Sequence, residues 1–272
     1  MIDQLKTDFP VAVICKALGL SRSSFYTRPA IKRGDKALLS AIDQILVKWP
    51  YYGYRRVMHE LQRMGYQVGE TRVRRLLRQI EHSCTMGKAT ISTTNSQHEH
   101  PRYPNLIKRL KVDHLNQVWV ADITYIRFGK KFIYLAVILD AFSRGIRGWK
   151  LGRTMDKGLT TAALKLALAI YPAPQIHHSD QGGQYATPEY TTLLPTTQLS
   201  MSAKGRPTEN GIVERFIRTF KEEHIDYTDY ENFNDAIEQI QYWLENEYMI
   251  ERIHSSLDYL TPLEFEIAHV TV

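Results

Sequence analysis

The sequence predicts an α/β protein in which an all-helical N-terminal region precedes a mixed β-sheet covered by helices. Three observations predict this fold. Apolar residues recur at helical spacing before residue 81, a polar stretch without periodicity follows, and runs of β-branched and aromatic residues begin at Val118. We therefore expect four regions, at residues 1–80, 81–107, 108–228 and 229–272.

The composition is typical of a folded protein. Of the 272 residues, 43% are hydrophobic and 11% aromatic, which is enough for packed cores. No apolar run approaches the roughly 20 residues of a membrane span, and the opening MIDQLKTDFP lacks the pattern of a secretory signal. The two cysteines, Cys15 and Cys84, are too few for a disulfide framework. We expect a cytoplasmic protein without a membrane partner.

The charge is distributed unevenly along the chain. From Glu222 to the end, the chain has thirteen acidic residues and one arginine, a net charge of −12. Because the whole chain has a net charge of +6, residues 1–221 have a net charge of +18. A surplus of this size predicts contact with a polyanion such as DNA.

The first helical pair resembles a helix-turn-helix. Apolar residues at Val11, Ile14 and Leu18 precede a turn at Gly19–Ser21 and a second helix that opens at Arg22. Any small helical hairpin shows such a pattern, so the pattern alone leaves both interpretations open.

A second helical pair follows. Val57, Leu61 and Met64 line one predicted helix, and apolar positions from Val73 to Ile80 line another, whose N-cap is expected at Thr71. Between Tyr51 and Ile80 the chain has seven arginines and only two glutamates. These arginines could form a DNA-binding surface or, alternatively, an ordinary solvated helix surface. We expect DNA contacts from Arg22 and from the arginines lying off the apolar stripe, Arg55, Arg56, Arg72, Arg74, Arg75 and Arg78.

The polar stretch 81–107 is interpreted as a linker. It contains four residues of types that bind zinc, His82, Cys84, His98 and His100. The spacing lacks the paired units of zinc sites, so we favour ordinary linker residues.

Beyond the linker, a three-strand meander is followed by alternating helix and strand. Strands are expected at 118–128, 132–139, 146–151 and 175–180, and a helix at 155–170. A mixed sheet with helices packed on it is the layout of the RNase-H-like architecture.

Two aspartates lie on these strands. Asp122 is in the middle of the first, between apolar neighbours, where an unpaired carboxylate is unfavourable by several kcal/mol. Asp180 ends the short strand in HHSDQGGQY, and strand ends of such sheets collect ligands. An arginine partner or an exposed strand end would explain either aspartate equally well in isolation.

Glu214 lies on a predicted helix, 209–223, but off its buried stripe. It shares a side with Arg218 and Lys221, so an ordinary surface pair is the alternative. The three acids gain meaning together, because cleavage of a phosphodiester can use two Mg²⁺ ions bound by clustered carboxylates. Without cations, three adjacent carboxylates would repel one another.

Six motifs, in this order along the chain, resemble the bacterial insertion-sequence transposases of the IS-three group, within the superfamily of DDE transposases and retroviral integrases. They are YYGYRRVMHEL, WVADITYI, LAVILDAFSR, IHHSDQGGQY, KGRPTENGIVERFIRTFKEE and IHSSLDYLTPLEF. The resemblance spans about residues 10 to 266.

The resemblance implies a catalytic, metal-binding triad at Asp122, Asp180 and Glu214, with Mg²⁺ as the cofactor and Mn²⁺ as a substitute. It also implies that the N-terminal helices bind the terminal inverted repeats of the element. Asp140 matches a motif of the family as well, and we interpret it as a structural residue rather than a metal ligand.

The sequence departs from the pattern of the family at three points. Asp180 and Glu214 have 33 residues between them where 35 are usual, which predicts a shortened loop near 193–205. Glu209 stands where Asp is commoner, and Arg215 where a small residue is common. The triad itself is intact.

We expect water activated at the triad to cleave a strand at the element's end, freeing a 3′-hydroxyl that attacks a second phosphodiester. Lys204, Arg206, Arg218 and Lys221 would hold the phosphate backbone. The double-stranded DNA partners would be element ends and target, in the bacterial nucleoid.

Joining two ends needs more than one subunit, so a homo-oligomer is expected. The acidic C-terminal helix, apolar at Phe233, Ile237, Ile240 and Leu244, would cover the core or contact a second protomer. The rival functions are a catalytically inert DNA-binding regulator descended from a transposase, and a nuclease that cleaves without joining.

Overall fold

The structure is a computed structural model of the chain, and it describes residues 10–17, 35–82, 101–203 and 207–270. The chain forms two compact units, Met1–Thr85 and Met86–Val272, which are described separately. The turn predicted at Gly19–Ser21, and Arg22 after it, lie outside the described residues. No helix in the described part of the chain is long and apolar enough to cross a membrane.

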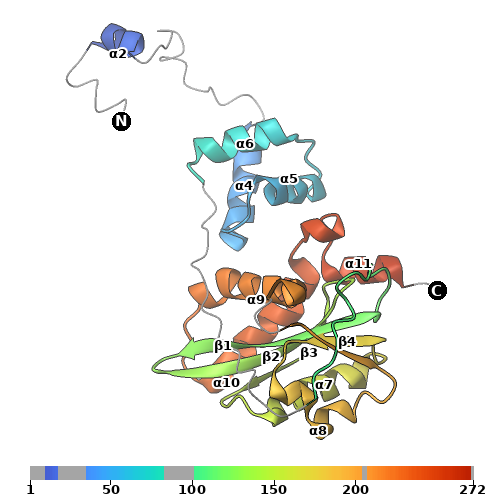
Figure 1. Cartoon of the computed structure of the whole chain (residues 1–272). Coiled ribbons are helices and arrows are strands. Elements are labelled where there is room, and N and C mark those ends of the chain that lie inside the picture. The colour runs from blue at the N-terminus through green and yellow to red at the C-terminus, as the bar shows by residue number, and fades with distance from the viewer. Residues whose placement is uncertain (1–9, 18–34, 83–100, 204–206, 271–272) are drawn as a thin grey trace. The chain divides into compact units, whose positions relative to one another are not determined.

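The N-terminal unit is helical, as predicted (Figure 1). Its described helices are Val11–Ala17 (α2), Asp35–Lys48 (α4), Tyr54–Arg63 (α5) and Glu70–Gln79 (α6). Helix α4 is not among the elements that the sequence pattern predicts. Helices α4, α5 and α6 share a core of fully buried side chains, Ile42, Val57, Leu61, Val73 and Leu76.

Three details predicted for these helices are wrong. Thr71 is not an N-cap, because α6 already begins at Glu70 with Gly69 in an extended conformation before it. Met64 and Ile80 do not line the buried faces, since they are 47% and 43% exposed. Each is the C-cap residue of its helix, where the chain turns and the apolar stripe ends.

An ion-paired carboxylate joins α4 to α6. Asp35 is fully buried, and it accepts hydrogen bonds from Arg72 Nε and Nη2 at 3.1 and 2.9 Å and from Arg75 Nη2 at 2.7 Å. Two of the arginines expected to contact DNA therefore also hold the unit together. A buried acid without these partners would be strongly destabilising.

The second unit contains a five-stranded sheet. The strands are Val118–Phe128 (β1), Lys131–Asp140 (β2), Ile146–Gly152 (β3), Ile176–Ser179 (β4) and Gln198–Met201 (β5). Their order in the sheet is β3-β2-β1-β4-β5, with the first three antiparallel and the last two parallel to β1. The meander and the mixed sheet are as predicted, whereas β5 is an additional strand that the sequence pattern does not reveal.

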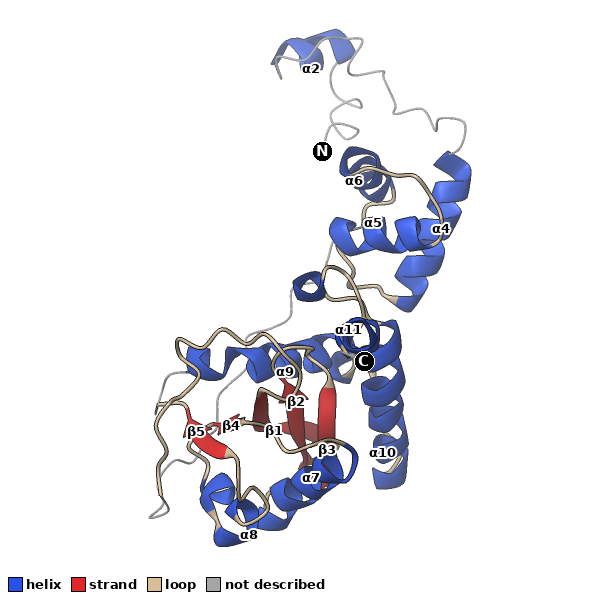
Figure 2. Ribbon diagram, turned by 90° about the vertical axis from the view of Figure 1, so that its right-hand side faces the viewer, coloured by secondary structure: helices blue, strands red, loops and turns tan. Residues whose placement is uncertain are grey.

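Helices cover both faces of the sheet (Figure 2). On one face lie Lys157–Ile170 (α7) and Pro188–Thr191 (α8), and on the other Gly211–Glu223 (α9) and Phe233–Tyr242 (α10). Alternation along β1 feeds the two layers, because Val118 and Val120 pack on the α9 side while Trp119 and Ala121 pack on the α7 side. Helix α7 begins two residues later than expected, after the N-cap Asp156, whose side chain accepts a hydrogen bond from Leu159 N.

The acidic C-terminal segment covers the core. Helix α10 continues into a π-helical stretch, Trp243–Glu251 (η4), and the chain ends the described part with Pro262–His269 (α11). Trp243 and Tyr248 are buried against Phe216 and Phe220 of α9. Covering the core is thus one of the two roles expected for this segment, and a contact with a second protomer stays a prediction.

Candidate active site

The two aspartates are brought together by strand pairing. Strands β1 and β4 run parallel, and their last paired residues are Ala121 and Ser179. Asp122 directly follows Ala121, and Asp180 directly follows Ser179. Because adjacent strands lie about 4.8 Å apart, the two carboxylates occupy neighbouring positions in the middle of the sheet, at the carboxyl end of β4. The sequence places each aspartate on a strand, but only this register places them side by side.

Asp122 is surrounded by like charge. Burial, and after it the negative charges of Asp180 and Glu214, raise its pKa from 3.8 to about 8, although a hydrogen bond from Ile123 N at 2.8 Å acts in the opposite direction. The charge of Lys221 lowers the pKa by a smaller amount. Among the described residues, the charges that act on Asp122 belong to two carboxylates and one lysine, and none of them is the arginine partner that would have given Asp122 a purely structural role.

A glycine fits closely against Asp180. Gly182 N donates a hydrogen bond to Asp180 Oδ1 at 2.9 Å, and a Cβ at residue 182 would lie only 2.8 Å from the same oxygen. The first glycine in HHSDQGGQY, Gly182, therefore leaves room for the aspartate side chain itself, not only for a ligand. This role of Gly182 is not evident in the sequence, since it depends on the direction of the Asp180 side chain.

Helix α9 begins beside Asp122. The buried Asn210, at the start of this helix, donates through Nδ2 to the carbonyl oxygen of Ala121 at 3.3 Å. Glu214 follows one turn later, off the buried stripe as predicted. Burial raises its pKa, and the charge of Arg218 lowers it. The structure thus brings Glu214 close enough to Asp122 for its charge to act on that carboxylate.

A lysine reaches the same place from further along α9. Lys221 Nζ lies 4.4 Å from the centre of the Tyr125 ring, and the charge of Asp122 raises its pKa against the larger lowering effect of burial. Of the four basic residues expected to hold DNA near the triad, Lys221 and Arg218 flank it. Lys204 and Arg206 lie outside the described residues.

Asp140, by contrast, is fully paired. Its Oδ1 accepts hydrogen bonds from the backbone of Phe142 and Ser143 at 2.9 Å each, and Oδ2 accepts one from Asn116 N at 2.7 Å. Arg147 Nη2 lies 3.5 Å from it. These contacts support the structural role expected for Asp140.

The chemistry of the cluster suits a hard cation. Within the described residues, no group of three His, Cys, Asp or Glu side chains is gathered so that it could hold a metal as it stands. The donors nevertheless fit Mg²⁺, since all three are carboxylates and a cation would relieve their repulsion. The buried hydroxyl of Tyr185 also has no hydrogen-bond partner among the described residues, and burial, followed by the charges of Asp122 and Asp180, raises its pKa.

The remaining sequence candidates are dispersed. Arg55, Arg74 and Arg78 are exposed on the N-terminal unit, and the guanidinium groups of Arg55 and Arg74 lie 5.2 and 4.8 Å from the Tyr54 ring centre. Arg56 lies 5.0 Å from the ring centre of Tyr52.

Of the four potential zinc ligands, only His82 is described. Its Nε2 lies 3.0 Å from the carbonyl oxygen of Tyr52. The other three, Cys84, His98 and His100, lie outside the described residues.

The sheet order and its helical layers define an RNase-H-like core of the integrase type. Two family models described as Integrase core domain match residues 113–207 and 196–262, and a model described as HTH-like domain matches residues 33–83.

Curated relatives cover nearly the whole chain. It is 34% identical over 263 residues to the "Insertion element IS600 uncharacterized 31 kDa protein" of Shigella sonnei, covering 93% of this chain and 97% of that protein. It is 30% identical over 281 residues to "Transposase InsF for insertion sequence IS3A" of Escherichia coli, covering 97% and 96%. The "Transposase for insertion sequence element IS904" of Lactococcus lactis is 34% identical over 220 residues, covering 79% and 87%. The chain belongs to the IS3 family of insertion-sequence transposases.

Solved structures show weaker likenesses. A simian T-cell lymphotropic virus intasome in complex with the PP2A regulatory subunit B56 gamma shares 17% identity at a TM-score of 0.49, covering 85% of this chain and 75% of that chain. The HTLV-2 integrase catalytic core domain in complex with magnesium (dimeric form) shares 17% at 0.43, covering 56% and 97%. The family assignment does not depend on either.

Proposed function

We propose that this transposase binds the ends of its element and catalyses Mg²⁺-dependent strand cleavage and strand transfer, with Asp122, Asp180 and Glu214 as the catalytic residues. The observation that carries the proposal is the electrostatic setting of Asp122. Its carboxylate is placed next to Asp180 by the β1–β4 register and is acted on by the charge of Glu214. Such repulsion disfavours folding, and a function that needs clustered acids explains why it persists.

In the proposed mechanism the three carboxylates would hold Mg²⁺, or Mn²⁺ in its place. The bound ions would offset the charge of the scissile phosphate and stabilise the leaving oxygen. The backbone NH groups of Ile123 and Gly182 orient Asp122 and Asp180 through hydrogen bonds of 2.8 and 2.9 Å. Water is the nucleophile in cleavage, and the freed 3′-hydroxyl is the nucleophile in joining.

Basic side chains on α9 would position the phosphate backbone. Lys221 lies beside Asp122, held over the Tyr125 ring, and Arg218 lies beside Glu214. Lys204 and Arg206 precede α9 in the sequence and are assigned the same task. The positively charged side chains at these positions would attract the DNA phosphates and would add no negative charge to the acidic cluster.

The N-terminal unit would recognise the terminal inverted repeats, as its match to an HTH-like domain suggests. Arg55, Arg74 and Arg78 are the exposed candidates for contacts to DNA, while Arg56, Arg72 and Arg75 would contribute alongside their described interactions. Arg22 belongs to the proposed surface by sequence alone.

Pairing two element ends requires at least two such units, so we expect a homo-oligomer on DNA. We expect it to act on target DNA in the bacterial nucleoid.

The test is incubation of the protein with labelled DNA carrying the terminal repeats, in Mg²⁺, in Mn²⁺ and in EDTA. Cleaved and joined products that need a divalent cation and are lost in Asp122→Asn would support the proposal. Cleavage without joining would indicate a nuclease instead. Specific binding without cleavage, by protein shown to be folded, would contradict the catalytic proposal.

A further inference from the structure

A short segment at the start of the catalytic unit crosses from one face of the sheet to the other. We call Tyr103–Lys108 the strap. Tyr103 packs with the buried cluster on the α7 side of the sheet, and Ile107 packs with the cluster on the α9 side. The strap is thus attached to both layers of the unit, and it lies beside β5, at the edge of the sheet.

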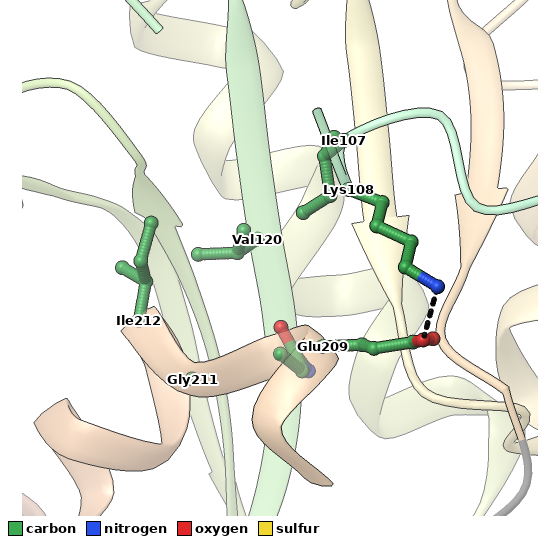
Figure 3. Close-up of a pocket in the computed structure, with 7 residues that line it drawn as sticks. Ile107, Lys108, Val120, Glu209, Gly211 and Ile212 are labelled. Atoms are coloured by element: carbon green, nitrogen blue, oxygen red, sulfur yellow. Dashed lines mark ion pairs between the residues drawn. The ribbon is translucent and has the colours of Figure 1, made fainter. Parts of the chain in front are cut away.

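The polar contacts of the strap converge on one carboxylate. Asn105 Nδ2 donates to Glu209 Oε2 at 2.9 Å, and Lys108 Nζ lies 3.9 Å from Glu209 Oε1. Figure 3 shows Lys108 and Glu209 facing each other beside Val120 of β1. The backbone NH of Ala203 also donates to Glu209 Oε2, at 2.8 Å. One oxygen therefore joins the strap to the chain that leaves β5.

The same network reaches β4, the strand that directly precedes Asp180. Ser200 Oγ, on β5, accepts a hydrogen bond from the strap at Leu106 N (2.9 Å) and lies 2.8 Å from His178 Nδ1. His178 is on β4, two residues before Asp180. Glu209, in turn, lies five residues before Glu214. Two of the proposed metal ligands are therefore close in sequence to residues of this network.

Apolar packing fixes one side of the start of α9, where Val213 is fully buried, and leaves the side facing the strap open. A cavity of about 510 Å³ lies between the strap, β1 and the first turn of this helix, lined by Ile107, Val120 and Ile212 among others. Where side chains do not fill the space between elements, packing cannot define their relative position closely. Polar contacts contribute to fixing it, because Asn210 is hydrogen-bonded to Ala121 O of β1 and Glu209 is bonded to the strap.

We propose that Glu209 is a positioning residue, through which the strap holds the start of α9 and so fixes the place of Glu214 in the triad. This inference depends on the proposed function. It assigns no contact with DNA, with a metal or with the reacting atoms to Glu209. Its effect on the reaction passes through Glu214, and a small displacement of a catalytic group can reduce a rate by about 100-fold.

The test compares four variants of the full chain. Glu209→Ala removes every contact of the carboxylate. Glu209→Gln keeps an oxygen that can accept from Asn105 and Ala203, and it changes only the side facing Lys108. Asn105→Ala removes one hydrogen bond, and Lys108→Gln, the matched control, removes the exposed ion pair alone. Each variant is assayed for joining rate, affinity for terminal-repeat DNA, the Mn²⁺ concentration at half-maximal rate, and cleavage by trypsin after Arg109 and Lys111, directly after the strap.

We expect Glu209→Ala to join roughly 10- to 100-fold more slowly and to need more Mn²⁺, while its affinity for terminal DNA changes less than about twofold. Trypsin should cut the chain directly after its strap faster than in the wild type. Glu209→Gln should recover most of the rate, and Lys108→Gln should stay close to the wild type. The Asn105→Ala change should have little further effect in a Glu209→Ala background, because the two residues act through one contact.

The inference is wrong if Glu209→Ala joins at the wild-type rate, if Glu209→Gln is as slow as Glu209→Ala, or if the two changes reduce the rate independently. A loss of DNA affinity equal to the loss of rate would also overturn it. Failure of the proposed function looks different, since the wild type itself would then not join DNA. The trypsin comparison still tests the contacts of the strap in that case.

Discussion

Two strand aspartates in this protein, Asp140 and Asp122, have opposite surroundings. Asp140 ends β2 and is fully buried, with backbone donors on both oxygens and Arg147 beside it. Asp122 lies on the neighbouring strand, and its described contacts are one backbone NH, two carboxylates and a lysine. The first arrangement stabilises a negative charge, and the second makes it unfavourable.

The difference separates the structural acid from the proposed catalytic one. A carboxylate whose partners are all supplied by the protein needs nothing further, and its loss should affect folding. A carboxylate that repels its neighbours is relieved only by a cation, so its loss should affect activity and leave the fold intact or more stable. The predictions below test this separation.

The largest effect is expected at Asp122. Asp122→Asn should reduce joining by roughly three orders of magnitude or more, because a proposed metal ligand is lost. It should also raise the melting temperature in EDTA, because repulsion with Asp180 and Glu214 disappears. Joining assays and thermal unfolding of the same preparation measure both. A melting temperature several degrees below the wild type would mean that Asp122 is structural after all.

Substitution of Asp140 should reduce the stability of the protein rather than its activity. Asp140→Asn leaves Arg147, which is almost completely buried, without one of its two acidic neighbours, and should lower the free energy of unfolding by about 3 kcal/mol. Urea unfolding measures this change. Asp113→Asn is the control, since the side chain of Asp113 is 62% exposed in its pair with His114 and should contribute almost nothing. Joining per folded molecule should be close to normal for Asp140→Asn, and a complete loss would place Asp140 in the catalytic machinery.

Gly182→Ala should affect Asp180 through space. The added Cβ would lie 2.8 Å from Asp180 Oδ1, so the carboxylate must turn away, and joining should fall roughly 10- to 100-fold. Gly211→Ala is the matched control, since no atom lies within 4 Å of the added Cβ and alanine favours helix. Equal rates for the two variants would show that the orientation of Asp180 does not depend on Gly182.

The stability of the protein should depend on pH through Asp122. Its pKa rises on folding from 3.8 to about 8, so the folded state binds the extra proton between these values and loses stability as the pH rises through them. In EDTA, the melting temperature should therefore fall from pH 5 to pH 8 by more in the wild type than in Asp122→Asn. Millimolar Mg²⁺ should reduce this difference, and identical slopes in EDTA would refute the assignment.

The smallest effects are expected among the arginines of the N-terminal unit. These arginines also divide into proposed DNA contacts and residues that stabilise the fold. Arg55→Gln or Arg78→Gln should weaken binding to terminal repeats modestly and lower the salt dependence by about one unit each, with unchanged stability. Arg72→Gln should destabilise the unit, because Arg72 pairs with the buried Asp35. Fluorescence binding at several salt concentrations and thermal unfolding separate the two classes. Equal loss of stability in all three variants would remove the distinction.

Much of the fold could be predicted from the sequence, because the long elements have strong periodicity. The strands β1 to β4 lie within one residue of their expected bounds, and β1 and β2 are the clearest because they are long and rich in apolar and β-branched residues. Strand β5 could not be predicted, because Gln198–Met201 is too short to show a period and is defined by its pairing with β4. Helix α4, in the N-terminal unit, could have been predicted, because its buried residues Leu38, Ala41, Ile42 and Ile45 recur at helical spacing.

The candidate site could be predicted only in part. The identities of Asp122, Asp180 and Glu214 come from their motifs, but the proximity of the two aspartates depends on a parallel pairing between residues 58 apart in the chain. The contacts of Gly182 and Glu209 depend on side-chain directions that no pattern shows. Arginines on α6 all look alike in the sequence, and only the buried position of Asp35 distinguishes Arg72 and Arg75 from the rest.

Each of the two units has its own buried core, and this has a genetic consequence. A substitution that removes one proposed catalytic carboxylate leaves the helices of the N-terminal unit packed as before. A decayed copy of the element would then still encode a protein that occupies terminal repeats without joining them. Such copies would compete with an intact transposase for the same DNA, so the accumulation of defective elements in a genome would itself restrain further transposition.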